Sequence, residues 1–423
     1  MGQPSETASP QLQRRLGVTD AVLIGLGSMI GAGIFAALAP AARAAGSGLL
    51  AGLAVAAVVA YCNATSSARL AARYPASGGT YVYGRERLGE FWGYLAGWAF
   101  VIGKTASCAA MALTVGSYVW PAHAHAVAVA AVVALTAVNY AGIQKSAWLT
   151  RAVVAVVLAV LAAVAVASLT SSASDTSRLD IGSDAGVTGV LQAAGLLFFA
   201  FAGYARIATL GEEVRDPART IPRAIPLALA LTLVVYAAVA VAVLTVLGPH
   251  GVAASDAPLS EAVRAAGADW LAPVVRVGAA VAALGSLLAL ILGVSRTTLA
   301  MARDRHLPHA LANVHPRFQV PHRAELLVGA VVAILAATTD LREAIGFSSF
   351  GVLVYYAVAN ASAWTLTRDE NRPPRIVPAV GLAGSLLLAF TLPAASVAWG
   401  TAVLALGIAA YAIRRAVTAR RKP

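Results

Sequence analysis

Stretches of about 20 apolar residues recur along almost the whole chain, and this pattern limits the fold more than any other feature. A helix of about that length crosses the roughly 30 Å hydrocarbon layer of a membrane. Hydrophobic residues make up 59% of the chain and charged residues 12%, too few charges for the surface of a soluble domain. The sequence therefore predicts an all-α integral membrane protein with about twelve transmembrane helices. The expected spans are 18–42, 47–66, 91–119, 124–141, 148–169, 189–210, 224–247, 271–300, 324–339, 344–366, 376–393 and 396–413.

The 31 Lys and Arg residues give a formal net charge of +12, and their positions follow the predicted topology. If the N-terminus is cytoplasmic, the inner segments hold the basic clusters 69–87, 215–223, 303–323 and 414–422, whereas the outer loops hold few basic residues. This asymmetry is the positive-inside rule, so the charge sets the orientation and does not indicate a nucleic-acid partner. We expect a protein integral to the cytoplasmic (plasma) membrane, with both termini in the cytoplasm.

Glycines interrupt the first and sixth predicted spans. The segment GSMIGAGIF (27–35) places three glycines in mid-span, and Gly203 followed by Arg206 does the same in span six. Each glycine weakens a helix by about 0.5–1 kcal/mol, and non-helical backbone is tolerated in a membrane only where it is buried in protein or lines a water-filled cavity. Two broken helices, each opening a five-span half, are typical of inverted-repeat transporters. Close helix packing through the Gly27–Gly31 spacing is the alternative.

A broken helix exposes both kinds of backbone dipole. The N–H groups that begin its outer half attract a carboxylate, and the carbonyl groups that end its inner half attract an ammonium group. The two ends together favour a zwitterionic ligand such as an amino acid. The expected division is an N-terminal tail (1–16), one membrane domain (17–413) made of repeat one (17–169), repeat two (189–366) and extra helices (376–413), and a basic tail (414–423).

Four motifs stand in order along the chain: GSMIGAGIF (27–35), YPASGGTYVY (74–83), FFAFAGYARIATLGEEVRDPARTIPRAI (198–225) and MARDRHLPHALANVHPRFQVP (301–321). In this order and spacing they resemble the amino acid, polyamine and organocation (APC) superfamily of permeases over nearly the whole chain. The resemblance implies two inverted five-helix repeats with broken helices 1 and 6, plus two extra C-terminal helices. It also implies secondary active transport of amino acids by alternating access, driven by a coupling ion, with a proton preferred over sodium, or by exchange of amino acids.

The resemblance also places the substrate. It implies a carboxylate site on the backbone of Gly31, Ala32 and Gly33, and an ammonium site near Met29, Phe199, Ala200 and Ala202, beside Gly203, with Phe199 as an aromatic lid. Bulky side chains at these positions should block transport. Two departures matter, because Ala32 stands where many relatives carry a hydroxyl residue and Ala205 stands where many carry an acid.

Lys104 and Arg206 are charges inside predicted spans. Lys104 lies about four turns into span three, where a buried ammonium can gain and lose a proton and act as a carrier or countercharge. A structural lysine bonded to backbone carbonyls is the alternative. Arg206 either pairs with the substrate or caps the broken carbonyls of span six. Both cations would repel arginine, lysine and polyamines, so neutral or anionic amino acids are favoured.

The inner side carries further candidates. Glu212, Glu213 and Arg215 follow span six and fit an ion-paired inner gate, with a solvated loop as the alternative. Four histidines between positions 306 and 322 match no metal-site spacing, so no metal or cofactor is expected. No catalytic or nucleotide-binding motif points to an enzyme or an ATP-driven pump. The rival function is a transport-silent amino acid sensor or a subunit of a larger complex.

Overall fold

The structure is a computed structural model that describes residues 16–31, 33–75, 78–142, 147–182, 184–208 and 214–420. Within these ranges the chain is helical, and its only β contact is an isolated parallel bridge between Leu16 and Val214. Among the described residues, ten helical stretches are long and apolar enough to cross a membrane. The predicted all-α membrane fold is therefore confirmed, whereas the count of about twelve transmembrane helices and the division into two inverted five-helix repeats stay predictions.

Each predicted span coincides with one helix or with a broken helix. The elements in the spans are α1 (Val18–Met29), α2 (Gly33–Ala36), α3 (Leu38–Ala45), α4 (Leu49–Arg73), α6 (Glu90–Val119), α7 (Ala124–Tyr140), α8 (Ala147–Leu169), α9 (Val187–Phe201), η4 (Ala202–Tyr204), α10 (Ala205–Ala208), α11 (Pro217–Ala254), α13 (Ala272–Arg303), α14 (His322–Thr338), α15 (Leu341–Trp364), α16 (Ile376–Thr391) and α17 (Ala394–Arg420). The connecting elements are η1 (Gly46–Gly48), α5 (Thr80–Leu88), η2 (Pro121–His123), η3 (Thr176–Leu179), α12 (Pro258–Ala265), η5 (Asp269–Leu271) and η6 (His309–Ala312).

Local sequence explains several helix ends. Gly89 adopts a φ of 104° between α5 and α6, a conformation that few residues other than glycine adopt. Pro121 follows α6 at its other end, where a proline cannot continue the hydrogen-bond ladder. Gly248, at a φ of 68°, breaks the helical geometry of α11 one residue after the predicted end of span seven.

The helices separate into a central group and a peripheral group. In α6 and α15, 83% of an apolar 18-residue stretch of the helix is buried, compared with 17% in the spans that contain α7 and α17. The two central helices approach closely at Gly103 and Gly351, where a Cβ atom on Gly351 would lie 2.9 Å from the α-carbon of Gly103. Of the broken helices, α2 packs against α6, and α9 packs against α15.

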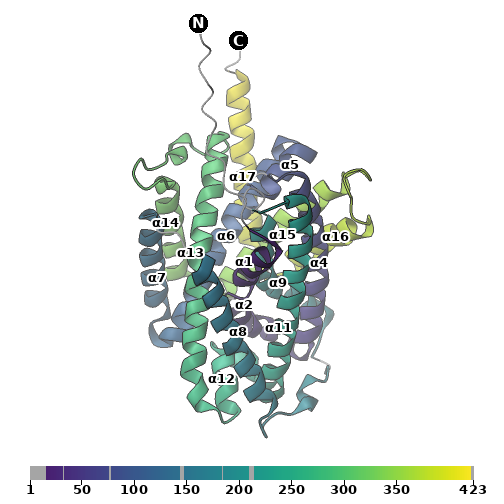
Figure 1. Cartoon of the computed structure of the whole chain (residues 1–423), viewed down its shortest axis with the longest axis vertical. Helices are drawn as coiled ribbons and strands as arrows, with labels where there is room; N and C mark the ends of the chain where they lie inside the picture. The colour runs from purple at the N-terminus through teal and green to yellow at the C-terminus, as the bar shows by residue number, and fades with distance from the viewer. Residues whose placement is uncertain are drawn as a thin grey trace.

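The two ends of the bundle differ in composition. Figure 1 shows α5 and the C-terminal end of α17 at the upper end and α12 at the lower end. The upper end carries basic residues predicted to be cytoplasmic, such as Arg85, Arg87 and Arg414. The arrangement therefore agrees with the charge asymmetry of the sequence.

Candidate functional site

The first break lies between α1 and α2. The last regular hydrogen bond of α1 runs from the Ile30 N–H to the Leu26 carbonyl at 2.7 Å, and Gly31 lies outside helical geometry. Helical bonding resumes at Gly33, whose carbonyl accepts from Ala37 at 2.9 Å. Ala32, the middle residue of the predicted carboxylate site, lies outside the described residues. The outer half therefore begins at Gly33 with N–H groups that have no intrahelical acceptor.

The second break is a change of helix type. The α-helix α9 ends at Phe201, a single 3₁₀ turn covers Ala202–Tyr204, and α10 resumes at Ala205. A 3₁₀ turn has poorer hydrogen-bond geometry than an α-helix, so its carbonyl groups remain better acceptors for other donors. The interruption predicted at Gly203 is therefore present.

The two breaks contact each other through backbone atoms. A Cβ atom on Gly203 would lie 2.3 Å from the Ser28 carbonyl oxygen, and one on Gly33 would lie 2.7 Å from the α-carbon of Ala200. Real Cβ atoms do not approach other atoms this closely. Both positions need glycine because the two chains could not otherwise approach so closely.

Two side chains bind the carbonyl groups at the breaks. The ammonium group of Lys104, on α6, donates to the Ala202 carbonyl at 3.2 Å, and Lys104 is buried. The Tyr236 hydroxyl, on α11, lies within hydrogen-bond distance of the carbonyl oxygens of Met29 and Ala200. One hydroxyl has one proton, so Tyr236 satisfies one of these carbonyls at a time. Three of the carbonyl groups predicted to face a substrate ammonium group thus have protein donors nearby.

The remaining predicted residues are distributed around the breaks. Met29, Phe199 and Ala200 are buried next to them. Arg206 is half-buried on α10, within one turn of Gly203, and Arg215 is exposed. Glu212 and Glu213, predicted to form an inner gate with Arg215, lie outside the described residues.

The residue just before the first broken helix and the segment just before α11 are nevertheless connected. Leu16, just before α1, forms the parallel bridge with Val214, and the Arg215 N–H donates to the Leu16 carbonyl at 2.8 Å. Asp20, in the first turn of α1, forms an ion pair with Arg151 of α8. Sequence reasoning did not identify this ion pair, because the partners are far apart in the chain.

Sequence reasoning also missed three side chains near the predicted spans. Tyr236 was detectable as an isolated hydroxyl in an apolar run, and a Cβ atom on Gly31 would lie 1.8 Å from the Ser286 hydroxyl oxygen of α13. Glu325, in the first turn of α14, is fully buried, and neither carboxylate oxygen has a hydrogen-bond partner.

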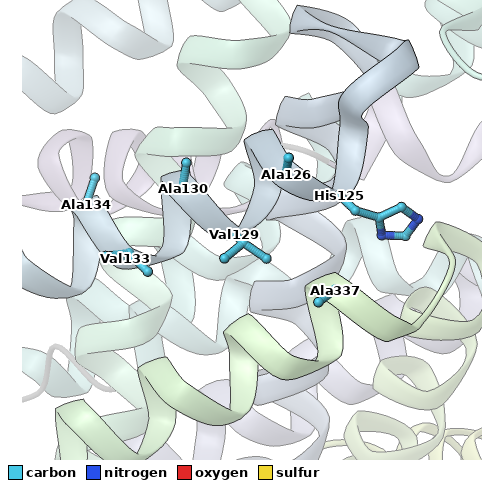
Figure 2. A pocket seen from close by; sticks show the side chains of 7 residues that line it. All are labelled: His125, Ala126, Val129, Ala130, Val133, Ala134 and Ala337. Atoms are coloured by element: carbon cyan, nitrogen blue, oxygen red, sulfur yellow. The ribbon is translucent and has the colours of Figure 1, made fainter.

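Other cavities lie away from the breaks. A groove of about 660 Å³ between α7 and α14 is lined mainly by Ala and Val side chains (Figure 2). His125 at its edge contacts the Ala336 carbonyl through its Nδ1 atom at 2.8 Å, so it has a structural partner. Across the described part of the chain, no group of three or more His, Cys, Asp or Glu side chains is arranged to hold a metal ion.

Known proteins share this sequence over most of its length. Residues 16–413 match a family model described as Amino acid permease. The chain is 79% identical to an uncharacterized transporter of Mycobacterium tuberculosis over 97% of this chain and 94% of the relative. It is 30% identical to cationic amino acid transporter 4 of Homo sapiens (87% of this chain, 62% of the relative) and 27% identical to the branched-chain amino acid permease BcaP of Bacillus subtilis (90% and 87%).

Proposed function

We propose, from the fact that this chain belongs to the amino acid permease family, that it is a secondary active transporter of amino acids. It works by alternating access, with the substrate site at its two broken helices. Family membership makes it an integral membrane transporter and not an enzyme. The observation that carries the finer proposal is the hydrogen bond from Lys104 to the Ala202 carbonyl, at the point where α9 ends and the 3₁₀ turn η4 begins. We further propose the cytoplasmic membrane as its location, with both termini in the cytoplasm.

The two ends of the substrate would use different backbone groups of the breaks. Its carboxylate would accept hydrogen bonds from the N–H groups that begin the outer half of helix one, from Gly31 to Gly33. Its ammonium group would donate to the carbonyls of Met29, Ala200 and Ala202. These are the carbonyls that Tyr236 and Lys104 now contact, so the substrate has to replace existing donors.

Lys104 and the substrate therefore compete for one acceptor. Two ammonium groups at the Ala202 carbonyl would repel each other strongly, because the surroundings are buried and poorly screened. Substrate binding would favour the neutral form of Lys104, and release would favour its protonation. This competition supports coupling to protons, with exchange of amino acids as the other mode.

The charges also support a substrate class. Lys104 and Arg206 are cationic, and Arg206 lies within one turn of the second break. A cationic side chain on the substrate would meet the same repulsion, whereas a neutral apolar side chain would not. Of the substrates that the relatives' names indicate, branched-chain amino acids fit these charges better than cationic ones.

Uptake into proteoliposomes tests this function. We expect the purified chain to accumulate radiolabelled leucine when a pH gradient is imposed or when unlabelled leucine is loaded inside, and arginine to compete poorly. Leucine binding without uptake under both conditions would instead favour a sensor. Efficient competition by arginine would contradict the charge argument.

Lys104→Met tests the coupling. We expect the variant to lose the pH dependence of leucine uptake, because the titrating competitor is absent. Thr105→Val is the matched control, since Thr105 is the next residue of α6 and its hydroxyl donates within that helix, to the Val101 carbonyl. If Lys104→Met keeps the normal rate and pH dependence, Lys104 is a structural residue and the coupling proposal is wrong.

A further inference from the structure

A second cavity lies at the basic end of the bundle, away from the two breaks. It has a volume of about 810 Å³ and lies between α6, α17 and the loop that follows α13. We call it the α6–α17 groove. Its lining residues are Tyr94, Trp98, Arg305, His306, Leu307, Pro308, His309, Leu406, Gly407, Ala410 and Arg414.

The floor of the α6–α17 groove is apolar and well fixed. The Tyr94 hydroxyl donates to the Gly407 carbonyl at 2.8 Å, and the Trp98 indole N–H donates to the Val403 carbonyl at 2.9 Å. These bonds satisfy the polar atoms of both aromatic side chains, so their rings present apolar surface to the groove. Toward the bilayer, α17 continues with exposed apolar side chains, including Leu406 and Trp399.

The rim of the groove is cationic. Arg305 and Arg414 both line the groove, one in the loop after α13 and one on α17. Burial is the largest influence on His306 and lowers its pKa, so the positive charge at neutral pH rests on the two arginines. The nearby Asp304 is already engaged, because its carboxylate accepts from Arg85 at 2.9 Å and from the Tyr81 hydroxyl at 2.5 Å. Glu90, at the start of α6, is the other acid whose charge reaches His306.

The backbone supports a functional reading of this rim. Arg305 has a φ of 59°, in the left-handed region that residues other than glycine seldom occupy. The following His306 is held by a contact between its Nδ1 atom and the Tyr81 hydroxyl at 2.8 Å. The loop is therefore fixed to α5, and it presents Arg305 to the groove at some conformational cost.

We propose that the α6–α17 groove binds the headgroup of an anionic phospholipid of the inner leaflet. The lipid phosphate lies between Arg305 and Arg414, and an acyl chain follows the apolar surface of Trp98 and Leu406. Paired arginines suit phosphate, and basic pockets between membrane helices on the cytoplasmic side recognise such headgroups. The bound lipid braces the loop after α13 against α6 and α17. This inference rests on the proposed orientation of the chain and not on its transport activity.

Native mass spectrometry of the full chain in detergent tests the groove. The probe is an equimolar mixture of phosphatidylglycerol and phosphatidylcholine with identical acyl chains. We expect preferential retention of one phosphatidylglycerol, and a loss of about five-fold in that preference for each arginine replaced in Arg305→Gln/Arg414→Gln. Because the readout is lipid retention, a failure of the transport proposal would leave the result unaffected.

Two further variants sharpen this test. Arg305→Lys/Arg414→Lys keeps the positive charge and should keep most of the preference. Arg317→Gln/Arg368→Gln removes two exposed arginines that do not line the groove, so it should leave the preference unchanged. Equal retention of the two lipids by the unaltered chain, or an unchanged preference in the glutamine variant of the groove, would overturn the proposal. Displacement of the lipid by millimolar inorganic phosphate would show a free-anion site and would also overturn it.

Discussion

The two breaks contact each other, yet they differ in how they are built. At the first break the chain leaves helical geometry at Gly31, and a side chain, Ser286, lies against that glycine. At the second break the helix only tightens, and Gly203 lies against the main chain of Ser28. In the proposed site, the first break provides the N–H donors and both breaks provide carbonyl acceptors, so the pair would complement a zwitterion. The difference also predicts which break better tolerates replacement of its glycine by alanine.

Gly203→Ala should have the largest effect. Its Cβ atom would lie 2.3 Å from the Ser28 carbonyl oxygen and 2.4 Å from the Ser28 carbonyl carbon, and backbone atoms cannot rotate away. We expect leucine uptake to fall about tenfold or more and the free energy of unfolding to fall by about 1–3 kcal/mol. Uptake and thermal unfolding in detergent measure the two effects.

Gly293→Ala is the matched control, because a Cβ atom there would meet nothing within 4 Å. Gly293 lies inside α13, so alanine should leave uptake unchanged and stabilise the helix by about 0.5–1 kcal/mol. Normal uptake by Gly203→Ala would mean that the second break does not need this close approach.

Tyr236→Phe should have the next largest effect, because it removes the group that contacts both breaks. The carbonyls of Met29 and Ala200 would lose their shared donor inside a buried region. We expect the free energy of unfolding to fall by about 1–3 kcal/mol, the range for a buried polar group left without a partner. The measurement is thermal unfolding in detergent. Tyr61→Phe, at an exposed tyrosine, serves as the control, and equal effects of the two substitutions would contradict the bridging role.

Gly31→Ala should have a smaller effect than Gly203→Ala. Its Cβ atom would meet the Ser286 hydroxyl oxygen at 1.8 Å, but a side chain can move, whereas the Ser28 backbone cannot. We expect a few-fold loss of uptake, and we expect Ser286→Gly to restore it in the double variant, because the two residues are in direct contact. No second substitution of a side chain should restore Gly203→Ala. Failure of the rescue would show that Gly31 is needed for its backbone conformation.

Replacement of Glu370, in a loop expected to lie outside the membrane, should have the smallest effect on stability, and that effect should depend on pH. The Thr367 N–H, which donates at 3.0 Å, and then Arg87 and Arg73 lower the pKa of Glu370 to about 2. A lowered pKa stabilises the folded state above the unfolded value of about 4.5, and this contribution disappears as the pH falls from about 4.5 to about 2.

Comparison of the unaltered chain with Glu370→Gln measures this contribution. At pH 7 we expect the variant to unfold at a temperature lower by on the order of 1 °C, and the difference should vanish near pH 2. Thermal unfolding in detergent across this range gives the profile. A difference that persists at pH 2 would mean that the amide disturbs the loop by itself. Leucine uptake at pH 7 should not change, in contrast to the substitutions at the breaks.

Sequence patterns located the breaks but not their partners. Gly31, Gly33 and Gly203 stood out because glycine is costly within a span, and apolar length and charge bias predicted the helices. Lys104 stood out as a charge in an apolar stretch. Its acceptor could not be predicted, because Ala202 lies 98 positions away and any carbonyl group at a helix break could accept a hydrogen bond from the ammonium group. Tyr236 lies 207 positions from Met29, and Asp20 lies 131 positions from Arg151.

By itself, the sequence determined that this chain is a bundle of membrane helices with two weakened points. The requirement to bury apolar surface and to pair every backbone dipole in lipid acts on local stretches, which a linear pattern records. Only the tertiary structure decided that the two weak points contact each other and that Lys104 and Tyr236 reach their carbonyls. Such contacts depend on how helices distant in the chain pack around Gly33 and Gly203, and a local pattern does not contain that information.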